Sequence, residues 1–238
     1  MDVHAAQWIG VRQRMEDAYA VSHFPQGTLA VVCDGMGGHS HGDLAARAAA
    51  DAFCAAFARL EGLETPLRLR GALDEANAAV GALLVEQGGE FGGTTLLAAY
   101  VTHHLLYHVS VGDSALFLWR GNTLSRLNED HSMRPYYQGV GPACALLPDS
   151  HCLRSALSGD SMELVDAPQQ GFPLLPHDRI ILASDGVEEL LSGCTPTQAV
   201  RRILSSTDTP LAPALVQAVE ALHYPFADNV TVLTMDAE

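Results

Sequence analysis

Short apolar runs recur along the chain, and turn-forming residues separate most of them. Runs of this length that are rich in Val, Ile and Leu are typical of buried β-strands. They predict strands at 3–12, 17–24, 28–34, 94–102, 103–111, 114–120, 122–128, 161–167, 179–185 and 229–235. Turn signals such as Gly112-Asp113 and Gly121-Asn122 lie between consecutive runs, which favours antiparallel hairpins.

A second pattern, rich in Ala and free of Gly and Pro, covers residues 44–60 and is typical of an α-helix. Phe53, Phe57 and Leu60 are spaced by four and then three residues, which places them on one face of that helix. Further helices are predicted at 67–86, 187–191, 196–205 and 211–223. Helices inserted into a hairpin-rich chain favour an α+β fold over alternating βαβ units.

The segment 132–160 lacks a clear hydrophobic period and contains Pro and Gly, so we predict an irregular, flap-like excursion there. No internal repeat, low-complexity tract or linker divides the rest of the sequence. With 238 residues, the sequence is interpreted as one domain spanning residues 1–238.

Composition narrows the functional classes. The formal net charge is −15, from 13 Lys and Arg against 28 Asp and Glu, which disfavours nucleic acid and anionic membranes as partners. No apolar run reaches the roughly 18 residues of a membrane span, and the N-terminus shows no pattern of a signal peptide. The five cysteines form no CxxC pair. We therefore expect a cytoplasmic protein in a reducing compartment.

Four aspartates lie at the ends or starts of predicted strands: Asp34, Asp113, Asp185 and Asp228. Carboxylates brought together at the ends of buried strands repel each other and lose hydration, so they require a neutralising cation. Lys and Arg are scarce in this chain. Carboxylate oxygens are the ligands that hard divalent cations prefer. The sequence therefore predicts a site for a divalent metal ion.

These aspartates belong to an ordered series of short motifs. The series runs Arg12-Gln-Arg-Met-Glu16-Asp17, Asp34-Gly35-Met-Gly-Gly-His39, Gly93-Thr94-Thr95, Gly112-Asp113-Ser114, Ser184-Asp185-Gly186 and Asp228-Asn229. Each motif alone is unspecific, but together they resemble the metal-dependent serine/threonine protein phosphatases of type 2C, the bacterial-type PPM family. The resemblance extends from about residue 8 to residue 235.

The resemblance implies a four-layer α-β-β-α sandwich, in which helix pairs flank two antiparallel sheets and the metal site lies at one end. It implies two Mn²⁺ or Mg²⁺ ions, with Asp34 bridging them and Gly35 offering its backbone carbonyl. Glu16 would act on one ion, and Asp185 and Asp228 would bind the other. A hydroxide between the ions would then attack the phosphoester directly, without a phosphoenzyme.

Other positions take supporting roles by the same resemblance. Asp17 would orient water bound to the metal, and Asp113 would help to hold a third, weaker ion. Arg12 would bind the substrate phosphate, a role that suits the planar, two-pronged guanidinium. Asn229 would steady the loop at Asp228.

The chain departs from the family pattern at several positions. Ala115 stands where relatives usually carry Arg, and Glu189 replaces an Asp of the third-metal site. Met36 follows the Asp-Gly pair where animal members carry a His, so a metal-bound water is the expected general acid. The stretch 132–152, where relatives carry a flap beside the active site, looks short.

The histidines raise further questions. His39 and His41 could suggest zinc, but the additional Cys or His ligands that such a site needs are not evident. A supporting role near the substrate is assigned to His39. His131 is interpreted as an anchor for the loop that follows a strand.

The leading hypothesis is a serine/threonine phosphatase whose partner is a phosphorylated protein, the substrate of a bacterial-type Ser/Thr kinase. We expect it to act as a monomer and to reverse kinase signalling. Three alternatives remain: a regulatory module without turnover, a phosphatase for a sigma-factor antagonist, and a hydrolase of nucleotides. The presence of Glu16, Asp34, Asp185 and Asp228 weighs against the first alternative.

Overall fold

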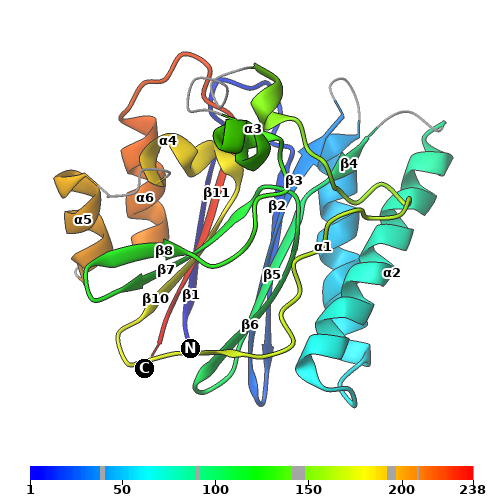
Figure 1. Cartoon of the computed structure of the whole chain (residues 1–238), viewed down its shortest axis with the longest axis horizontal. Helices are drawn as coiled ribbons and strands as arrows, with labels where there is room; N and C mark the ends of the chain where they lie inside the picture. Colours follow the sequence, from blue (N-terminus) through cyan, green and yellow to red (C-terminus); the bar gives the residue numbers. More distant parts are fainter. Residues whose placement is uncertain (38–40, 89–91, 141–147, 192–196, 208, 238) are drawn as a thin grey trace.

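The computed structural model describes residues 1–37, 41–88, 92–140, 148–191, 197–207 and 209–237. Two antiparallel sheets pack face to face, and helices cover both outer surfaces (Figure 1). One sheet has the spatial order β1 (Val3–Trp8), β11 (Val230–Asp236), β10 (Arg179–Ala183), β7 (Ala115–Arg120) and β8 (Thr123–Arg126). The other has the order β2 (Asp17–Phe24), β3 (Gly27–Met36), β5 (Leu96–Val101), β6 (Leu105–Val111) and β9 (Phe172–Pro173), with β4 (Gly93–Thr94) paired to β3.

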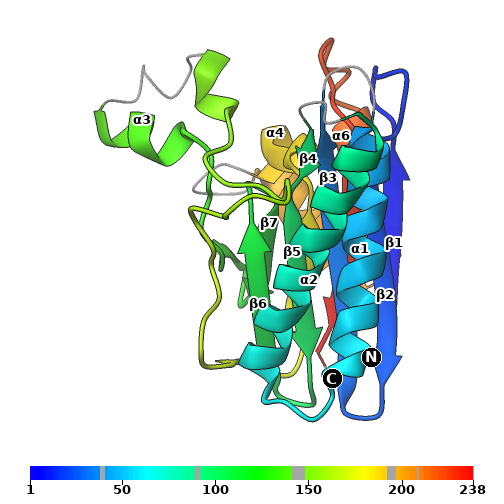
Figure 2. The ribbon, with the colours of Figure 1, turned by 90° about the vertical axis from the view of Figure 1, so that its right-hand side faces the viewer.

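Helices form the two outer layers. The long helices α1 (Gly42–Arg59) and α2 (Thr65–Glu86) cover the sheet that contains β3, and they run side by side along it (Figure 2). On the other side lie α4 (Glu188–Leu191), α5 (Gln198–Ser205) and α6 (Leu211–Glu220). No helix in the described part of the chain is long and apolar enough to cross a membrane.

Three hydrophobic cores separate the four layers, which explains why the central strands are mostly apolar. Leu29, Val31 and Cys33 of β3 face α1 and α2. Ala30 and Val32 of the same strand face the opposite sheet. A third core packs α5 and α6 against the outer face of the other sheet. Both faces of these strands are buried, so apolar residues occupy most of their positions; Thr231 and Thr234 of β11 are buried exceptions.

The structure corrects several predictions. Residues 161–167 do not form a strand, and only an isolated bridge joins Asp166 to Ser110. The first strand ends at Trp8, well before residue 12, and the predicted strand 94–102 is divided into β4 and β5. The segment 132–160, predicted as irregular, contains α3 (Arg134–Val140) and a 3₁₀-helix (Pro148–His151). Figure 2 shows α3 projecting away from the sandwich.

Strand direction brings the predicted site residues to one end of the sandwich. Asp17 begins β2 and pairs with Asp34 near the end of β3. Asp185 follows β10, and Asp228 precedes β11, which pairs antiparallel with β10. Asp113 follows β6. Each of these strands therefore places its aspartate at the same end of the sandwich.

Candidate metal centre

A cavity of about 380 Å³ opens at this end of the sandwich. Eight of the predicted site residues line it: Arg12, Glu16, Asp34, Gly35, Asp113, Asp185, Asp228 and Asn229. Asp17 is only 6% exposed and does not line the cavity. His39 lies outside the described residues, and Glu189 is placed only by its backbone in α4. The structure thus gathers most of the predicted set in one place.

Cavity size alone would not locate this site. A cavity of about 490 Å³ lies at the opposite end of the sheet, between Trp119 and Arg179. There the Arg179 guanidinium already donates to Asp236 Oδ1 at 2.8 Å and to the Leu204 carbonyl at 3.0 Å. The smaller cavity differs because carboxylates are concentrated in it.

Asp17 is buried with half of its carboxylate unsatisfied. Its Oδ2 accepts hydrogen bonds from Ser184 Oγ at 2.8 Å and from Thr231 Oγ1 at 2.7 Å. Its buried Oδ1 has no hydrogen-bond partner. Burial raises the pKa of Asp17 to about 6, and the negative charge of Asp228 adds to the rise. A buried acceptor in this condition costs free energy unless a cation or ordered water satisfies it.

Asp34 lies at the centre of the carboxylates. Burial raises the pKa of Asp34 well above its usual range, and the nearby charges of Asp17, Asp185, Asp113 and Asp228 raise it further. The neighbouring charges that act on the Asp34 carboxylate are negative, and a positive charge beside it would lower its pKa. A divalent cation would remove both the repulsion and the cost of desolvation.

Residues of the Gly-Thr-Thr and Gly-Asp-Ser motifs hold the Asp34 backbone. The Thr95 hydroxyl accepts from Asp34 N at 2.9 Å and lies 2.9 Å from the Ser114 hydroxyl. The Thr94 hydroxyl donates to Asp34 O at 3.0 Å. These roles were not predicted, although the sequence motifs contain the residues. Thr231, inside an apolar strand, carried no sequence signal at all.

Gly35 is required by a close approach of three backbone segments. A Cβ at this position would lie 2.1 Å from Gly42 O and 2.7 Å from Glu16 O. Gly35 N also donates to Glu16 O at 3.2 Å. The start of α1 and the Glu16 segment can therefore both pack against the end of β3 only if residue 35 has no side chain.

Arg12 and Asn229 tie the N-terminal loop to the turn at Asp228. The Arg12 guanidinium pairs with Asp228 Oδ2 at 2.5 Å, and both side chains are substantially exposed. Asn229 Oδ1 accepts from Glu16 N at 2.7 Å, and Asn229 Nδ2 donates to Ile9 O at 2.8 Å. Asn229 therefore fixes the backbone on both sides of Arg12.

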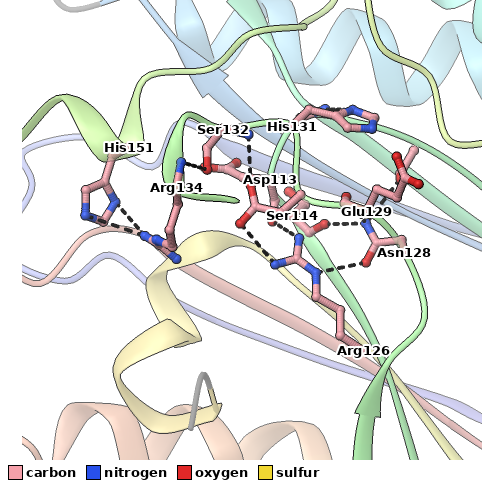
Figure 3. A network of polar contacts seen from close by, with 12 residues as sticks. Asp113, Ser114, Arg126, Asn128, Glu129, His131, Ser132, Arg134 and His151 are labelled. Atoms are coloured by element: carbon pink, nitrogen blue, oxygen red, sulfur yellow. Dashed lines mark hydrogen bonds and ion pairs between the residues drawn. The ribbon is translucent and has the colours of Figure 1, made fainter. Parts of the chain in front are cut away.

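A polar network supports Asp113 from behind (Figure 3). Arg126 Nη2 donates to Asp113 O at 2.8 Å, and Asn128 Nδ2 donates to Ser114 O at 2.9 Å. His131 Nδ1 accepts from Gly112 N at 3.2 Å, and burial lowers the pKa of His131. This geometry agrees with the interpretation of His131 as a loop anchor.

The segment after α3 also reaches the cavity. His151, Cys152 and Leu153 line it beside the carboxylates. Arg134 Nη2 of α3 lies 2.9 Å from His151 Nδ1 (Figure 3). The sequence suggested a flap at this place but did not identify which residues contact the cavity.

The donor set fits Mn²⁺ or Mg²⁺. Its side chains present oxygen ligands, the choice of hard cations. Within the described residues, no three Asp, Glu, His or Cys side chains converge tightly enough to enclose an ion alone. Mg²⁺ commonly binds only one or two carboxylates and keeps several waters, so a spread carboxylate cluster suits it.

Comparison with known proteins identifies the class. A family model described as Protein phosphatase 2C matches residues 7–220. The chain belongs to this family of metal-dependent serine/threonine protein phosphatases. The predicted family and the predicted α-β-β-α sandwich are thereby confirmed.

Individual relatives agree. The serine/threonine phosphatase stp of Listeria welshimeri is 31% identical over 218 residues, covering 87% of this chain and 84% of the relative. The PPM phosphatase MsPP from Mycobacterium smegmatis has a TM-score of 0.79 at 25% identity, covering 100% of this chain and 99% of that one. The catalytic domain of the serine/threonine phosphatase PstP, solved with two manganese ions, has a TM-score of 0.73 at 26% identity, covering 99% and 97%.

Proposed function

We propose that this chain removes phosphate from serine and threonine residues of proteins with the help of two divalent metal ions. The observation that carries the proposal is the cluster around Asp34, where the described lining of one cavity brings five carboxylates together with one arginine, Arg12. Membership of the Protein phosphatase 2C family supports the same activity.

The residues that would hold the ions are Glu16, Asp34, the Gly35 carbonyl, Asp185 and Asp228. When bound, the ions supply a hydroxide at neutral pH and stabilise negative charge on the phosphoryl group. Asp34 is central, so it would contact both ions. Mn²⁺ and Mg²⁺ both suit the oxygen ligands.

Asp17 would act on water beside the ions. Ser184 and Thr231 occupy its Oδ2, which leaves Oδ1 to accept a hydrogen bond from that water. Asp113 and Glu189 would contribute to a third ion. His39 would lie near the substrate, on the loop that follows Asp34.

Arg12 would bind the substrate phosphate. Its present partner, Asp228, is a carboxylate at a solvent-exposed position. Exposed pairs of this kind contribute little free energy. A phosphate dianion offers the same planar guanidinium a doubly charged partner, so the exchange is favourable. Asn229 would keep the backbone around Arg12 and Asp228 in place.

The proposed substrate, location, oligomeric state and domain extent follow from the same resemblance to bacterial phosphatases. The substrate would be a phosphoprotein modified by a bacterial-type Ser/Thr kinase, and the phosphatase would act in the cytoplasm as a monomer. Residues 1–238 would form one domain, with 132–160 as its flap. The net charge of −15 argues against a nucleic-acid partner.

Hydrolysis of a phosphothreonine peptide tests the function. The protein is stripped with a chelator, assayed, and assayed again after Mn²⁺ is restored. We expect activity only with Mn²⁺, and none in Asp185→Asn. Asp74→Asn, an exposed α2 position outside the cavity, is the matched control and should keep full activity. Mn²⁺ binding without turnover on any phosphopeptide would favour the regulatory-module alternative instead.

A further inference from the structure

A second hollow of about 270 Å³ adjoins the carboxylate cavity. The two share three lining residues: His151, Asp185 and Asp228. The far wall of the second hollow is apolar and comes from the end of α6 and the loop before β11. We call this wall the apolar shelf; it consists of Val219, Leu222, Tyr224 and Phe226.

Three of the four shelf residues are exposed although they are large and apolar, whereas Val219 is buried at 4% exposure. Phe226 is 77% exposed, Leu222 is 49% exposed and Tyr224 is 44% exposed. The Tyr224 and Phe226 rings meet edge to face, with centroids 6.2 Å apart. Single exposed apolar residues are ordinary, but adjoining ones beside a polar cavity are typical of binding surfaces.

The backbone beneath the shelf is anchored to the Arg12 loop. Val11 N donates to Ala227 O at 3.0 Å, and Ala227 N donates to Tyr224 O at 3.2 Å. Gly10 has φ of +66°, and a Cβ there would lie 2.2 Å from Asp228 O. The two loops can approach this closely only because residue 10 is glycine. The shelf and the predicted phosphate ligand Arg12 are therefore positioned together.

We propose that the apolar shelf binds an apolar side chain of the substrate near its phosphorylated residue. The proposal rests on the proposed function and names the class of substrate that the site prefers. The occupant is an extended phosphopeptide segment that carries Leu, Ile, Met or Phe close to the phosphoserine or phosphothreonine.

We choose a phosphopeptide as the occupant because the two hollows are continuous. A phosphate held by Arg12 and by cations bound at Asp185 and Asp228 would lie at the border of the second hollow, because both carboxylates line both spaces. An extended chain advances roughly 3.3 Å per residue. A side chain within about three positions of the phosphorylated residue therefore reaches the shelf.

Other occupants fit less well. An anionic membrane would meet a chain of net charge −15 whose shelf borders a carboxylate cluster. A second copy of the chain would cover the carboxylate cavity that the substrate must enter. A peptide can reach the shelf while its phosphate enters that cavity.

The test compares phosphothreonine peptides of one length with Mn²⁺ present. The reference peptide carries only Gly and Ser around the phosphothreonine, and Leu is then placed at each of the three positions on either side. Burial of a Leu side chain on the shelf should raise kcat/KM about tenfold at one or two positions. Leu at the remaining positions should have little effect.

Phe226→Ala and Tyr224→Ala test whether the shelf causes the preference. Both variants should reduce the gain from Leu to below about threefold, while kcat/KM for the reference peptide stays at the wild-type value. Phe226→Leu should retain most of the preference. The control is Leu67→Ala, which removes an apolar side chain of similar exposure, 54%, at the start of α2. It should leave every peptide unaffected.

The outcomes separate the two proposals. Hydrolysis without any preference for Leu, or a preference that survives both Ala variants, overturns the shelf while the phosphatase stands. A change of oligomeric state in Phe226→Ala during size-exclusion chromatography would assign the shelf to a contact between copies, and the proposal would be wrong. If no peptide is hydrolysed, the phosphatase assignment fails. Calorimetric binding of the Leu and reference peptides to wild type and Phe226→Ala then still decides whether the shelf selects apolar side chains.

Discussion

The two ends of strand β10 each carry an aspartate, and their surroundings differ. Asp178, just before the strand, is 1% exposed and accepts from Arg120 Nε and from Leu175 N, each at 2.8 Å. Asp185, just after the strand, joins the carboxylates around Asp34. One strand thus connects a carboxylate with its own cation to a cluster of carboxylates that crowd one another.

The pKa shifts of the two ends have opposite signs. Burial alone would raise the pKa of Asp178, but the hydrogen bonds from Arg120 and Leu175 and the Arg120 charge outweigh it, so the pKa is lowered. At the other end burial and the neighbouring carboxylates raise the pKa of Asp34. A buried carboxylate with an internal cation is compensated within the fold, whereas we expect the crowded cluster, with Arg12 at Asp228, to take a further cation from solution.

Asp34→Asn should produce the largest effect, because it removes the charge of the central carboxylate of the cluster. We expect kcat/KM with Mn²⁺ to fall at least about a thousandfold, which corresponds to ~4 kcal/mol of transition-state stabilisation. The chelated variant should melt at a higher temperature than chelated wild type, since a neutral amide relieves the repulsion. Steady-state kinetics and thermal denaturation check both statements.

Asp74→Asn is the charge-matched control for this variant, because Asp74 is an exposed α2 residue paired only locally with Arg70. Addition of Mn²⁺ should raise the melting temperature of this control and of wild type, but much less that of Asp34→Asn. Turnover by metal-saturated Asp34→Asn at near the wild-type rate would contradict the role of this carboxylate.

Arg120→Ala tests the other end of the comparison. It leaves the Asp178 carboxylate buried without its cation and removes a hydrogen bond to Pro173 O, 2.8 Å in length. The free energy of unfolding should fall by about 2 kcal/mol. Urea denaturation measures the loss, and kcat of the folded fraction should not change. An equal stability of the variant and wild type would show that Asp178 does not need the guanidinium.

Much of this fold follows from the apolar pattern, because both faces of the central strands are buried. The apolar pattern gives a wrong prediction where residues are buried but do not belong to a paired strand. In the segment 161–167, predicted as a strand, Met162, Val165 and Ala167 pack against the core, but the segment pairs with β6 through the isolated bridge between Asp166 and Ser110 and forms no continuous ladder. Helix α3 has no buried residue, so it carries no hydrophobic period that a sequence could reveal.

The residues of the candidate site likewise include some that the sequence pattern predicts and some that it does not. The aspartates were predictable because each adjoins an apolar strand, and strand direction then collects them. The partners of Asp17, namely Ser184 and Thr231, come from sequence distances of 167 and 214 residues. The shelf residues are equally hidden, since exposed aromatics in a loop have no period. Contacts that depend on tertiary packing cannot be deduced from local pattern.

The pH dependence of stability should also have opposite signs at the two ends. The pKa of Asp17 is about 6 in the folded chelated protein, against an ordinary 3.8. A raised folded pKa adds stability that is fully present below about pH 4 and is lost as the pH rises through 6. Chelated protein should therefore gain about 1 kcal/mol from pH 7 to pH 5.

The lowered pKa of Asp178 acts in the other direction: it adds stability above the ordinary value of 3.8, which is lost as the pH falls below it. Urea denaturation of chelated protein between pH 7 and pH 3 should therefore show a maximum of stability near pH 4. Saturating Mn²⁺ should abolish the gain between pH 7 and pH 5, because protons compete with the ion. Chelated protein that only loses stability on acidification from pH 7 would contradict the uncompensated cluster.

Arg12→Ala should have the smallest effect on the fold and still change the chemistry. Arg12 lines the same cavity as the cluster, but its pair with Asp228 is exposed, with side-chain exposures of 53% and 39%. The free energy of unfolding should therefore change by less than about 0.5 kcal/mol. KM for a phosphopeptide should rise about tenfold, since the guanidinium is the predicted ligand of the phosphate. Arg14→Ala, an exposed arginine two residues away, should change neither quantity. If Arg12→Ala lowered stability as much as Arg120→Ala while KM stayed constant, Arg12 would be a structural cation like Arg120, and the cluster would have an internal partner after all.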